Sequence, residues 1–321
     1  MPTVASTNVQ VIDSFGGADL IHTETQPIAR PGAGEVQLKV AAVAVNPVDL
    51  QTRSGTVVDP EVAKFPMVLG WDVAGTIHEV GTDVEGWQVG DRVAAMVFQP
   101  IEQRGTYAEY LNLDAELVAA VPDGLGLEQA ATIPLAGLIA SQMVRWVDLS
   151  AGDTLLVDGP VGGVGRLVVQ LASRAGIEVI AVAKPEDRAQ VIELGAGEVV
   201  ERGDFTAAVH ELHPDGVDAA IDVVGGAAAR AALASVRDGG ALGTTYTDYA
   251  DAGDQLTSER DIRFEVLTVH PDTADLAGLL EAAGRGELIT TIDTTYALSD
   301  AAQAHRRYEK GGVRGRLVLV P

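Results

Sequence analysis

The chain has 321 residues, 47% hydrophobic and 21% charged, which is enough to bury the core of one large domain or two ordinary ones. Its 46 acidic and 22 basic residues give a formal net charge of −24, so nucleic acids and anionic membranes are excluded as expected partners. It has no cysteine, which excludes disulfides, thiolate zinc sites and a cysteine nucleophile. With no run of eighteen apolar residues and no leader pattern at the N-terminus, we expect a cytoplasmic protein without a membrane span.

The first part of the chain, up to Pro122, has the texture of a β-rich domain. Short apolar runs alternate with stretches of Gly, Pro, Asn and Asp, a pattern that predicts strands joined by irregular connections. The clearest of these runs are Val36–Val45, Val73–Val80, Arg92–Val97 and Leu117–Val121.

Beyond Pro122 the pattern changes to an alternation of strands and helices. Such an alternation predicts a parallel sheet covered by helices on both faces. The expected strands are Thr154–Val157, Val179–Val182, Ala219–Val224, Ala241–Thr245 and Phe264–Val269, and the expected helices include Gly162–Gly176, Pro185 to just before Gly195, and Gly226–Val236. The tail then adds an amphipathic helix, Tyr296–Glu309, and a last strand, Arg316–Val320. Because that strand comes after the alternation has stopped, we expect it to return to the first domain.

A glycine-rich segment, Asp158-Gly159-Pro160-Val161-Gly162-Gly163-Val164-Gly165, lies between an expected strand and an expected helix. In a dinucleotide-binding fold this turn points a helix N-terminus at the pyrophosphate. Gly162 would let the backbone approach the phosphates, and Gly165 would let the helix pack against the strand. Pro160 stands where the first glycine of the usual G-x-G-x-x-G motif falls. The competing interpretation is a structural turn, but the strand before it and the helix after it favour the dinucleotide site.

The end of the following strand indicates which dinucleotide binds. An NAD site carries an acidic residue about 20 positions after the loop, which binds the ribose hydroxyls. Here the strand ends in Ala183-Lys184 instead. Lys184, together with Arg188 and Arg202, is a candidate for binding a 2′-phosphate, so we expect NADPH. The alternative is that all three cations are ordinary surface charges.

Several motifs in order along the chain resemble those of the quinone oxidoreductases (the zeta-crystallin-like family), a zinc-free branch of the medium-chain dehydrogenases/reductases. They are Asn46-Pro47-Val48-Asp49 with Arg53-Ser54-Gly55, Pro66 to Gly75, Val89-Gly90-Asp91-Arg92-Val93, Gly105 to Tyr110, Ala130 to Pro134, the glycine-rich segment and Gly315 to Leu319. The resemblance implies an α/β fold in which a Rossmann doubly wound parallel sheet is inserted into a GroES-like β-rich catalytic domain. We expect the catalytic domain to comprise residues 1–123 plus 271–321, and the Rossmann domain residues 124–270.

The resemblance also implies chemistry without a metal. The zinc enzymes of the superfamily carry a cysteine near Asn46 and a His-Glu pair near Trp71-Asp72, so only one carboxylate remains here. A single acid does not make a zinc site. Asn46 is the first candidate to position cofactor or substrate, and Gln51, which stands where many relatives have a tyrosine, is the candidate donor to the substrate oxygen. The expected cofactor contacts are Asn46, Thr132, Pro160, Val161, Gly162, Gly163, Val164, Ala183, Lys184, Arg188, Arg202, Val223, Val224, Gly225 and Arg314.

The expected activity is therefore NADPH-dependent hydride transfer to a quinone or other activated carbonyl compound. Such acceptors are already electron-poor, so the protein need supply only orientation and a hydrogen-bond donor. Two alternatives stay open: an enoyl or enone reductase of the same fold, and a catalytically silent NADPH-binding protein. By resemblance we also expect a homodimer paired through the strand Phe264–Val269.

Overall fold

The computed structural model describes residues 5–99, 104–246 and 258–321. The chain divides into two compact units, one formed by Met1–Leu138 with His270–Pro321 and the other by Ile139–Val269. Helix α4 (Pro134–Val147) runs through the first boundary. The predicted domains, residues 1–123 with 271–321 and residues 124–270, remain a prediction.

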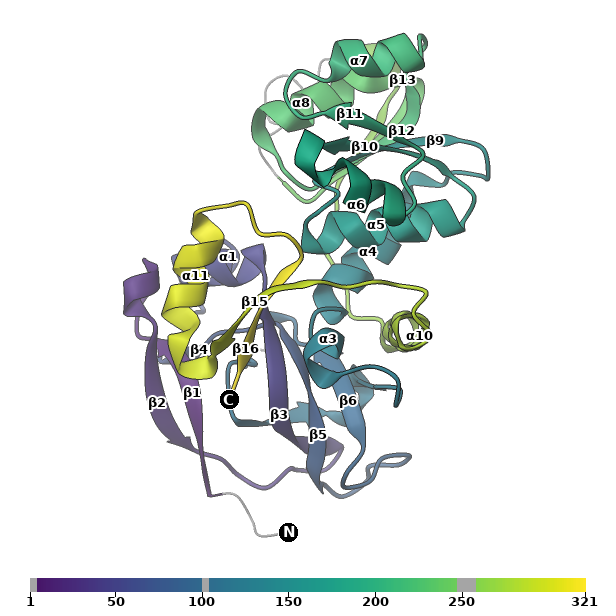
Figure 1. The fold of residues 1–321 in the computed structure, drawn as a ribbon. Coiled ribbons are helices and arrows are strands. Elements are labelled where there is room, and N and C mark those ends of the chain that lie inside the picture. Colours follow the sequence, from purple (N-terminus) through teal and green to yellow (C-terminus); the bar gives the residue numbers. More distant parts are fainter. Residues whose placement is uncertain (1–4, 100–103, 247–257) are drawn as a thin grey trace. The chain divides into compact units, whose positions relative to one another are not determined.

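The first unit is built on β-sheets (Figure 1). One sheet has the order β2-β1-β4, and a larger one has the order β15-β16-β3-β5-β6-β8, with β7 also paired to β3. The strands are β1 (Ser6–Ile12), β2 (His22–Pro27), β3 (Glu35–Val45), β4 (Met67–Val68), β5 (Asp72–Val80), β6 (Arg92–Met96), β7 (Tyr110–Asp114), β8 (Val118–Ala120), β15 (Ile292–Ala297) and β16 (Arg316–Val320). The helices are α1 (Pro47–Ser54), α3 (Leu127–Ala130), α10 (Thr273–Gly284) and α11 (Ala301–Glu309), with short 3₁₀ turns at Ala18–Leu20, Ala115–Leu117 and Leu298–Asp300.

The last strand returns to the first unit, as predicted. β16 pairs antiparallel with β3, with Leu317 opposite Val45 and Leu319 opposite Val43. All four side chains are fully buried. Burying β-branched and leucine side chains in a shared core is the main driving force for this long-range pairing.

The second unit is the parallel sheet that the alternation of strands and helices predicts. Its strand order is β11-β10-β9-β12-β13-β14, and every pairing in it is parallel. The strands are β9 (Thr154–Asp158), β10 (Glu178–Ala183), β11 (Glu198–Glu201), β12 (Val217–Asp222), β13 (Val236–Thr244) and β14 (Arg263–Val266). The helices are α5 (Gly163–Arg174), α6 (Arg188–Glu193), α7 (Thr206–Leu212) and α8 (Gly226–Ser235), with a 3₁₀ turn at Pro185–Asp187.

Helices cover this sheet on both sides: Figure 1 shows α5 and α6 against one face and α7 and α8 against the other. Leu155, Leu156 and Val157 of the central strand β9 are completely buried, as expected of a parallel strand packed on both faces. The expected strand Phe264–Val269 is shorter than predicted and ends at Val266. β11 and α7 were not among the predicted elements, because their apolar runs are too short to show a clear period.

Candidate cofactor-binding and active sites

The glycine-rich segment forms the turn between β9 and α5. Gly159 has a φ of 85°, in the left-handed region, where a side chain would be strained. A Cβ on Gly165 would lie 2.2 Å from the carbonyl oxygen of Gly159 and 2.7 Å from its carbonyl carbon, so no side chain fits between helix and strand. A Cβ on Gly162 would meet only the Gly159 oxygen, at 3.5 Å. Gly165 therefore sets the close packing of α5 on β9.

The start of α5 has the features of an anion site. Gly162 is the N-cap residue and has extended backbone angles. Because it is a glycine, no N-cap side chain binds the first amides of the helix. Amide groups in the first turn of such a helix lack intrahelical acceptors, and the helix dipole adds positive potential there. Of the expected contact residues, Pro160 and Gly163 are buried, while Val161, Gly162 and Val164 are partly exposed.

A second loop at the carboxyl edge of the sheet packs against the glycine-rich turn. A Cβ on Gly159 would meet the side chains of Val223 at 2.8 Å and of Val224 at 3.0 Å. The buried carboxylate of Asp222 holds this loop: it accepts hydrogen bonds from the amides of Val224 (3.0 Å) and Gly225 (3.1 Å). The expected contacts Val223, Val224 and Gly225 are thus brought to the turn by Asp222. Our interpretation of the sequence missed Asp222, although an acid at a strand end before Gly-Gly is a recognisable turn signal.

Asp158, at the end of β9, is an unusual neighbour for a turn that is expected to bind phosphate. Its side chain is buried and its Oδ2 has no hydrogen-bond partner among the described residues. Burial, and after it the nearby charge of Asp222, raise the pKa of Asp158 to about 7, although the charge of Arg202 acts in the opposite direction. Close to neutral pH this carboxyl group is therefore divided between its protonated and ionised forms.

Of the three cations predicted to bind a 2′-phosphate, Lys184 and Arg202 lie next to each other. The Arg202 amide donates to the carbonyl oxygen of Ala183 (3.0 Å), which places Arg202 beside the end of β10 and next to Lys184. Lys184 is exposed, and its Nζ lies 4.0 Å from Glu186, itself exposed. Arg188 differs, because its Nη1 donates to the carbonyl oxygen of Val199 (3.1 Å). Ala183, Lys184 and Arg202 form one group, and the Arg188 side chain is directed to the β11 backbone.

In the first unit, Asn46 lies at the centre of a buried polar cluster. It caps α1, and its Nδ2 donates to Asp72 Oδ2 (2.9 Å). The Arg316 guanidinium donates both to Asn46 Oδ1 and to Asp72 Oδ2, the latter at 3.1 Å. Asp72 Oδ1 accepts from the amide of Leu135 (2.7 Å). Burial raises the pKa of Asp72, and the charge of Arg316 and the Asn46 hydrogen bond oppose that rise.

A chain of polar side chains leads from this cluster to the protein surface. Burial raises the pKa of Asp49 to about 7. Burial first, and the nearby charge of Asp49 second, raise the pKa of the Tyr107 hydroxyl. That hydroxyl lies 3.3 Å from His305 Nε2, and His305 Nδ1 lies 3.4 Å from Arg53 Nη1. Burial first, and the charge of Arg53 second, lower the pKa of His305 to about 3, so the imidazole is neutral. The chain ends at the Arg53–Glu309 ion pair (2.6 Å).

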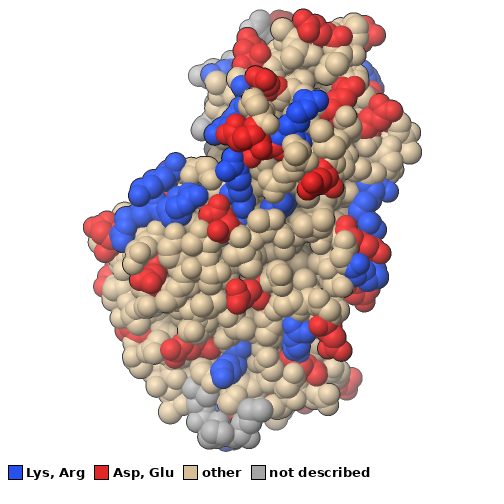
Figure 2. All heavy atoms as spheres, viewed as in Figure 1, with Lys and Arg blue, Asp and Glu red and all other residues tan. Residues whose placement is uncertain are grey.

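The other expected site residues of this unit have separate surroundings. Gln51 is half-buried on α1. Thr132 is buried, and its hydroxyl donates to the carbonyl oxygen of Gln129 (2.6 Å). Arg314 is exposed, and its amide donates to Asp293 (3.0 Å). Figure 2 shows Lys and Arg side chains gathered at the end of α11 and the segment after it, a segment that contains Arg314.

The positions that correspond to zinc ligands in the superfamily do not suit a metal. The Asn46 amide and both oxygens of Asp72 are engaged by protein partners, and Trp71 Nε1 donates to Thr52 Oγ1 (3.0 Å). No group of three or more histidine or carboxylate side chains suited to a metal occurs within residues 5–99, 104–246 and 258–321. Zinc needs three or four converging ligands, and these residues do not provide them.

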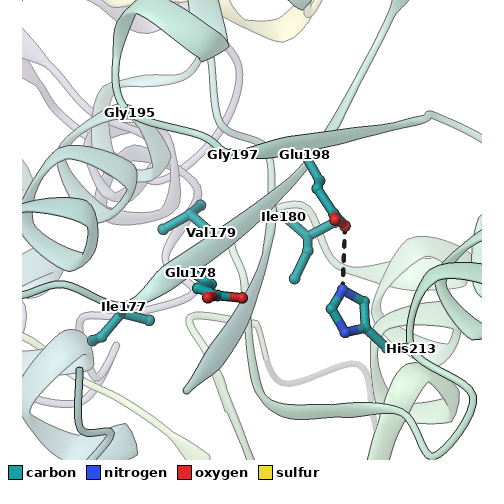
Figure 3. Close-up of a pocket in the computed structure, with 8 residues that line it drawn as sticks. All are labelled: Ile177, Glu178, Val179, Ile180, Gly195, Gly197, Glu198 and His213. Atoms are coloured by element: carbon teal, nitrogen blue, oxygen red, sulfur yellow. Dashed lines mark hydrogen bonds and ion pairs between the residues drawn. The ribbon is translucent and has the colours of Figure 1, made fainter. Parts of the chain in front are cut away.

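A cavity of about 340 Å³ in the second unit lies away from the carboxyl edge of the sheet, where the cofactor is expected. Its lining comes from the amino-terminal ends of β10 and β11, including Glu178 and Gly197, and from His213. Figure 3 shows the Glu198–His213 pair that borders it, with Oε2 and Nε2 3.2 Å apart. Ligands of open parallel sheets bind at the carboxyl ends of the strands, so this cavity is not the cofactor site.

Comparison with known proteins agrees with the fold and the motifs. Residues 32–123 match the alcohol dehydrogenase GroES-like domain, and residues 194–319 match a domain described as zinc-binding dehydrogenase. An Arabidopsis thaliana chloroplastic NADPH-dependent alkenal/one oxidoreductase is 34% identical over 97% of this chain and 78% of its own.

Two solved structures extend the likeness to the whole fold. The quinone oxidoreductase from Coxiella burnetii has a TM-score of 0.90 at 28% identity, covering 98% of this chain and 99% of its own. A mycobacterial protein complexed with NADPH has a TM-score of 0.87 at 29% identity, covering 98% of this chain and 100% of its own. Among the described residues, no helix is both long and apolar enough to cross a membrane. The chain belongs to the quinone-oxidoreductase-like medium-chain dehydrogenases/reductases, a family of oxidoreductases.

Proposed function

We propose that this protein transfers hydride from NADPH to a quinone or another activated carbonyl compound, without zinc. The observation that carries the proposal is the Asn46–Asp72–Arg316 cluster. The side chains at the metal-ligand positions are bound to one another, so a carbonyl substrate cannot rely on a Lewis acid there. Acceptors that are already electron-poor are the substrates that react without one.

The proposed cofactor fits the second unit. The N-cap Gly162 leaves the first amides of α5 without a side-chain cap, which suits a pyrophosphate, and the end of β10 is followed by Lys184 rather than an acid. The adjacent Arg202 adds a second cation. NADPH in the mycobacterial structure and in the name of the Arabidopsis relative supports the same choice. When bound, the reduced nicotinamide supplies the hydride.

The protein's own side chains then have to orient the acceptor and stabilise the charge that develops on its oxygen. The Gln51 amide, half-buried on α1, is the proposed donor to that oxygen. Asn46 is proposed to position cofactor or substrate, and its amide plane is held by Asp72 and Arg316. The final proton is proposed to come from water.

A second candidate function is reduction of the C=C bond of an enal or enone. The 34% identity to an alkenal/one oxidoreductase favours it, and such substrates are also activated without a metal. Both functions use the same cofactor and the same donor to the carbonyl oxygen, and they differ in the carbon that accepts hydride.

The test is NADPH oxidation measured with a panel of quinones and a matched panel of enals and enones, together with elemental analysis of the active protein. We expect turnover with one panel, no loss of activity after chelation, and a lower kcat in Gln51→Ala with an unchanged Kd for NADPH. Stoichiometric zinc that is required for activity would refute the metal-free proposal. NADPH binding without turnover on either panel would instead identify a silent binding protein.

We further propose a homodimer formed through β14, the terminal strand in the sheet order. The Leu267 amide donates to the Thr244 carbonyl (2.8 Å) in the neighbouring strand. Amides along a strand alternate in direction, so that of Val266 points away from β13. A proline at position 266 therefore removes an outward donor without breaking the bond from Leu267.

A further inference from the structure

Arg166 is a buried cation in the first turns of α5. Only 2% of the residue is exposed, and neither Nε nor Nη1 has a hydrogen-bond partner within the described residues. Burial lowers the pKa of its guanidinium to about 10, with no acidic neighbour among the described residues to offset the effect, yet the group remains charged at neutral pH. Arg166 therefore carries a positive charge for which the described residues provide no counter-ion.

Two other buried arginines show how this protein normally treats such a charge. Arg316 donates to the carboxylate of Asp72, and Arg53 forms an ion pair with Glu309. An unpaired guanidinium removed from water is strongly unfavourable, since neither solvent nor a carboxylate compensates its charge. In a chain with 46 acidic and 22 basic residues, it is unexpected that no acid among the described residues pairs with Arg166.

The position of Arg166 along α5 makes the lack of an acidic partner among the described residues more significant. The residue follows Gly165 and lies one turn beyond the N-cap Gly162, where the helix dipole is positive. A cation at this end of a helix is repelled, whereas an anion is attracted. Side chains of a helix lean toward its N-terminus, so we infer that the Arg166 side chain lies over the turn that starts at Gly162. Because residues 162, 163 and 165 are glycines, Val164 is the one residue of 162–165 with a side chain.

We propose that Arg166 is the counter-ion of the cofactor's pyrophosphate, acting together with the amides at the start of α5. The inference rests on the proposed use of NADPH. It adds a specific charge pair that the glycine-rich motif alone does not provide. The pyrophosphate is common to NADPH and NADH, whereas the 2′-phosphate is proposed to lie at Lys184, beyond the end of β10. Arg166 therefore contributes to affinity for both cofactors, and Lys184 contributes to the choice between them.

The test compares Arg166→Met and Arg166→Lys with Lys184→Ala in fluorescence titrations of NADPH and NADH. A charge-assisted hydrogen bond to a phosphate is worth about 10-fold to 100-fold in affinity. Arg166→Met should weaken both cofactors by a similar factor of this size, and Arg166→Lys should restore part of the loss. Lys184→Ala, the matched control, should weaken NADPH alone.

A second measurement, of thermal unfolding with and without inorganic pyrophosphate, does not depend on activity. The unliganded Arg166→Met protein should melt at the same temperature as the wild type or higher, because an unpaired buried charge has been removed. Pyrophosphate should raise the melting temperature of the wild type and not that of the variant. A lower melting temperature in the unliganded variant, with unchanged affinity for both cofactors, would show that Arg166 is a structural cation and would overturn the proposal.

The two proposals can fail separately. If the wild type binds neither nicotinamide cofactor, yet pyrophosphate stabilises it only when Arg166 is present, the proposed function fails and the anion site remains. If NADPH binds and Arg166→Met leaves its Kd unchanged, the proposed role of Arg166 fails and the proposed function remains.

Discussion

Replacing Arg316 with methionine tests the buried cluster that occupies the positions of the zinc ligands. Arg316 is 2% exposed, and its guanidinium is the only cation that contacts Asp72 in the described part of the chain. Methionine keeps the apolar bulk of the side chain and removes the charge. Asp72, fully buried, then keeps a carboxylate with only the Asn46 amide and the Leu135 amide as donors. Breaking a buried ion pair in this way costs about 3–5 kcal/mol.

The assay is thermal unfolding followed by circular dichroism at neutral pH. For a unit of this size each kcal/mol lowers Tm by about 2–4 °C, so Arg316→Met should lower it by about 6–20 °C. Asp72→Asn combined with Arg316→Met should cost less than the sum of the two single changes, since the uncompensated charge is gone. The exposed Arg314→Met is the matched control and should change Tm by less than about 2 °C. An Arg316→Met protein as stable as the control would refute the cluster as a stabilising ion pair.

Three further outcomes follow from the same geometry. Gly165→Ala places a Cβ 2.2 Å from the Gly159 carbonyl oxygen, so we expect the substitution to displace α5. NADPH binding should weaken at least about 10-fold in a titration. An affinity equal to that of the wild type would contradict the close packing. The pKa of Asp158 is raised to about 7 from 3.8, so the unfolded chain loses this proton at a lower pH than the folded protein does. The free energy of unfolding therefore falls as pH rises from about 4 to 7. Asp158→Asn should therefore be more stable than the wild type above pH 7, by up to about 4 kcal/mol at 1.36 kcal/mol per pKa unit, and equal to it near pH 4 in denaturant titrations; a constant difference would rule this out. Val266→Pro should convert the dimer to a monomer in light scattering with little loss of Tm, whereas a wild type that is already monomeric at high concentration would end the dimer proposal.

The sequence alone determined the class of the fold and the place of the glycine-rich turn. Both depend on patterns that are local in the chain: alternating apolar runs, a glycine-rich segment between a strand and a helix, and a strand end with Lys184 instead of an acid. The late strand Arg316–Val320 also indicated its own destination, because an apolar strand beyond the α/β alternation needs another sheet to pair with, and it pairs with β3.

The tertiary structure decided which polar side chains meet. Arg316 donates to Asn46 across 270 positions of sequence, and Asp222 holds the turn that packs on Gly159. The same is true of Arg166, because its burial, with no hydrogen-bond partner for Nε and Nη1 among the described residues, is visible only after folding. Periodicity reports whether a position faces the core, since burial of apolar area is additive along an element. The free energy of a charge depends instead on the few atoms within hydrogen-bonding distance of it, and the chain brings those together only when its distant segments pack.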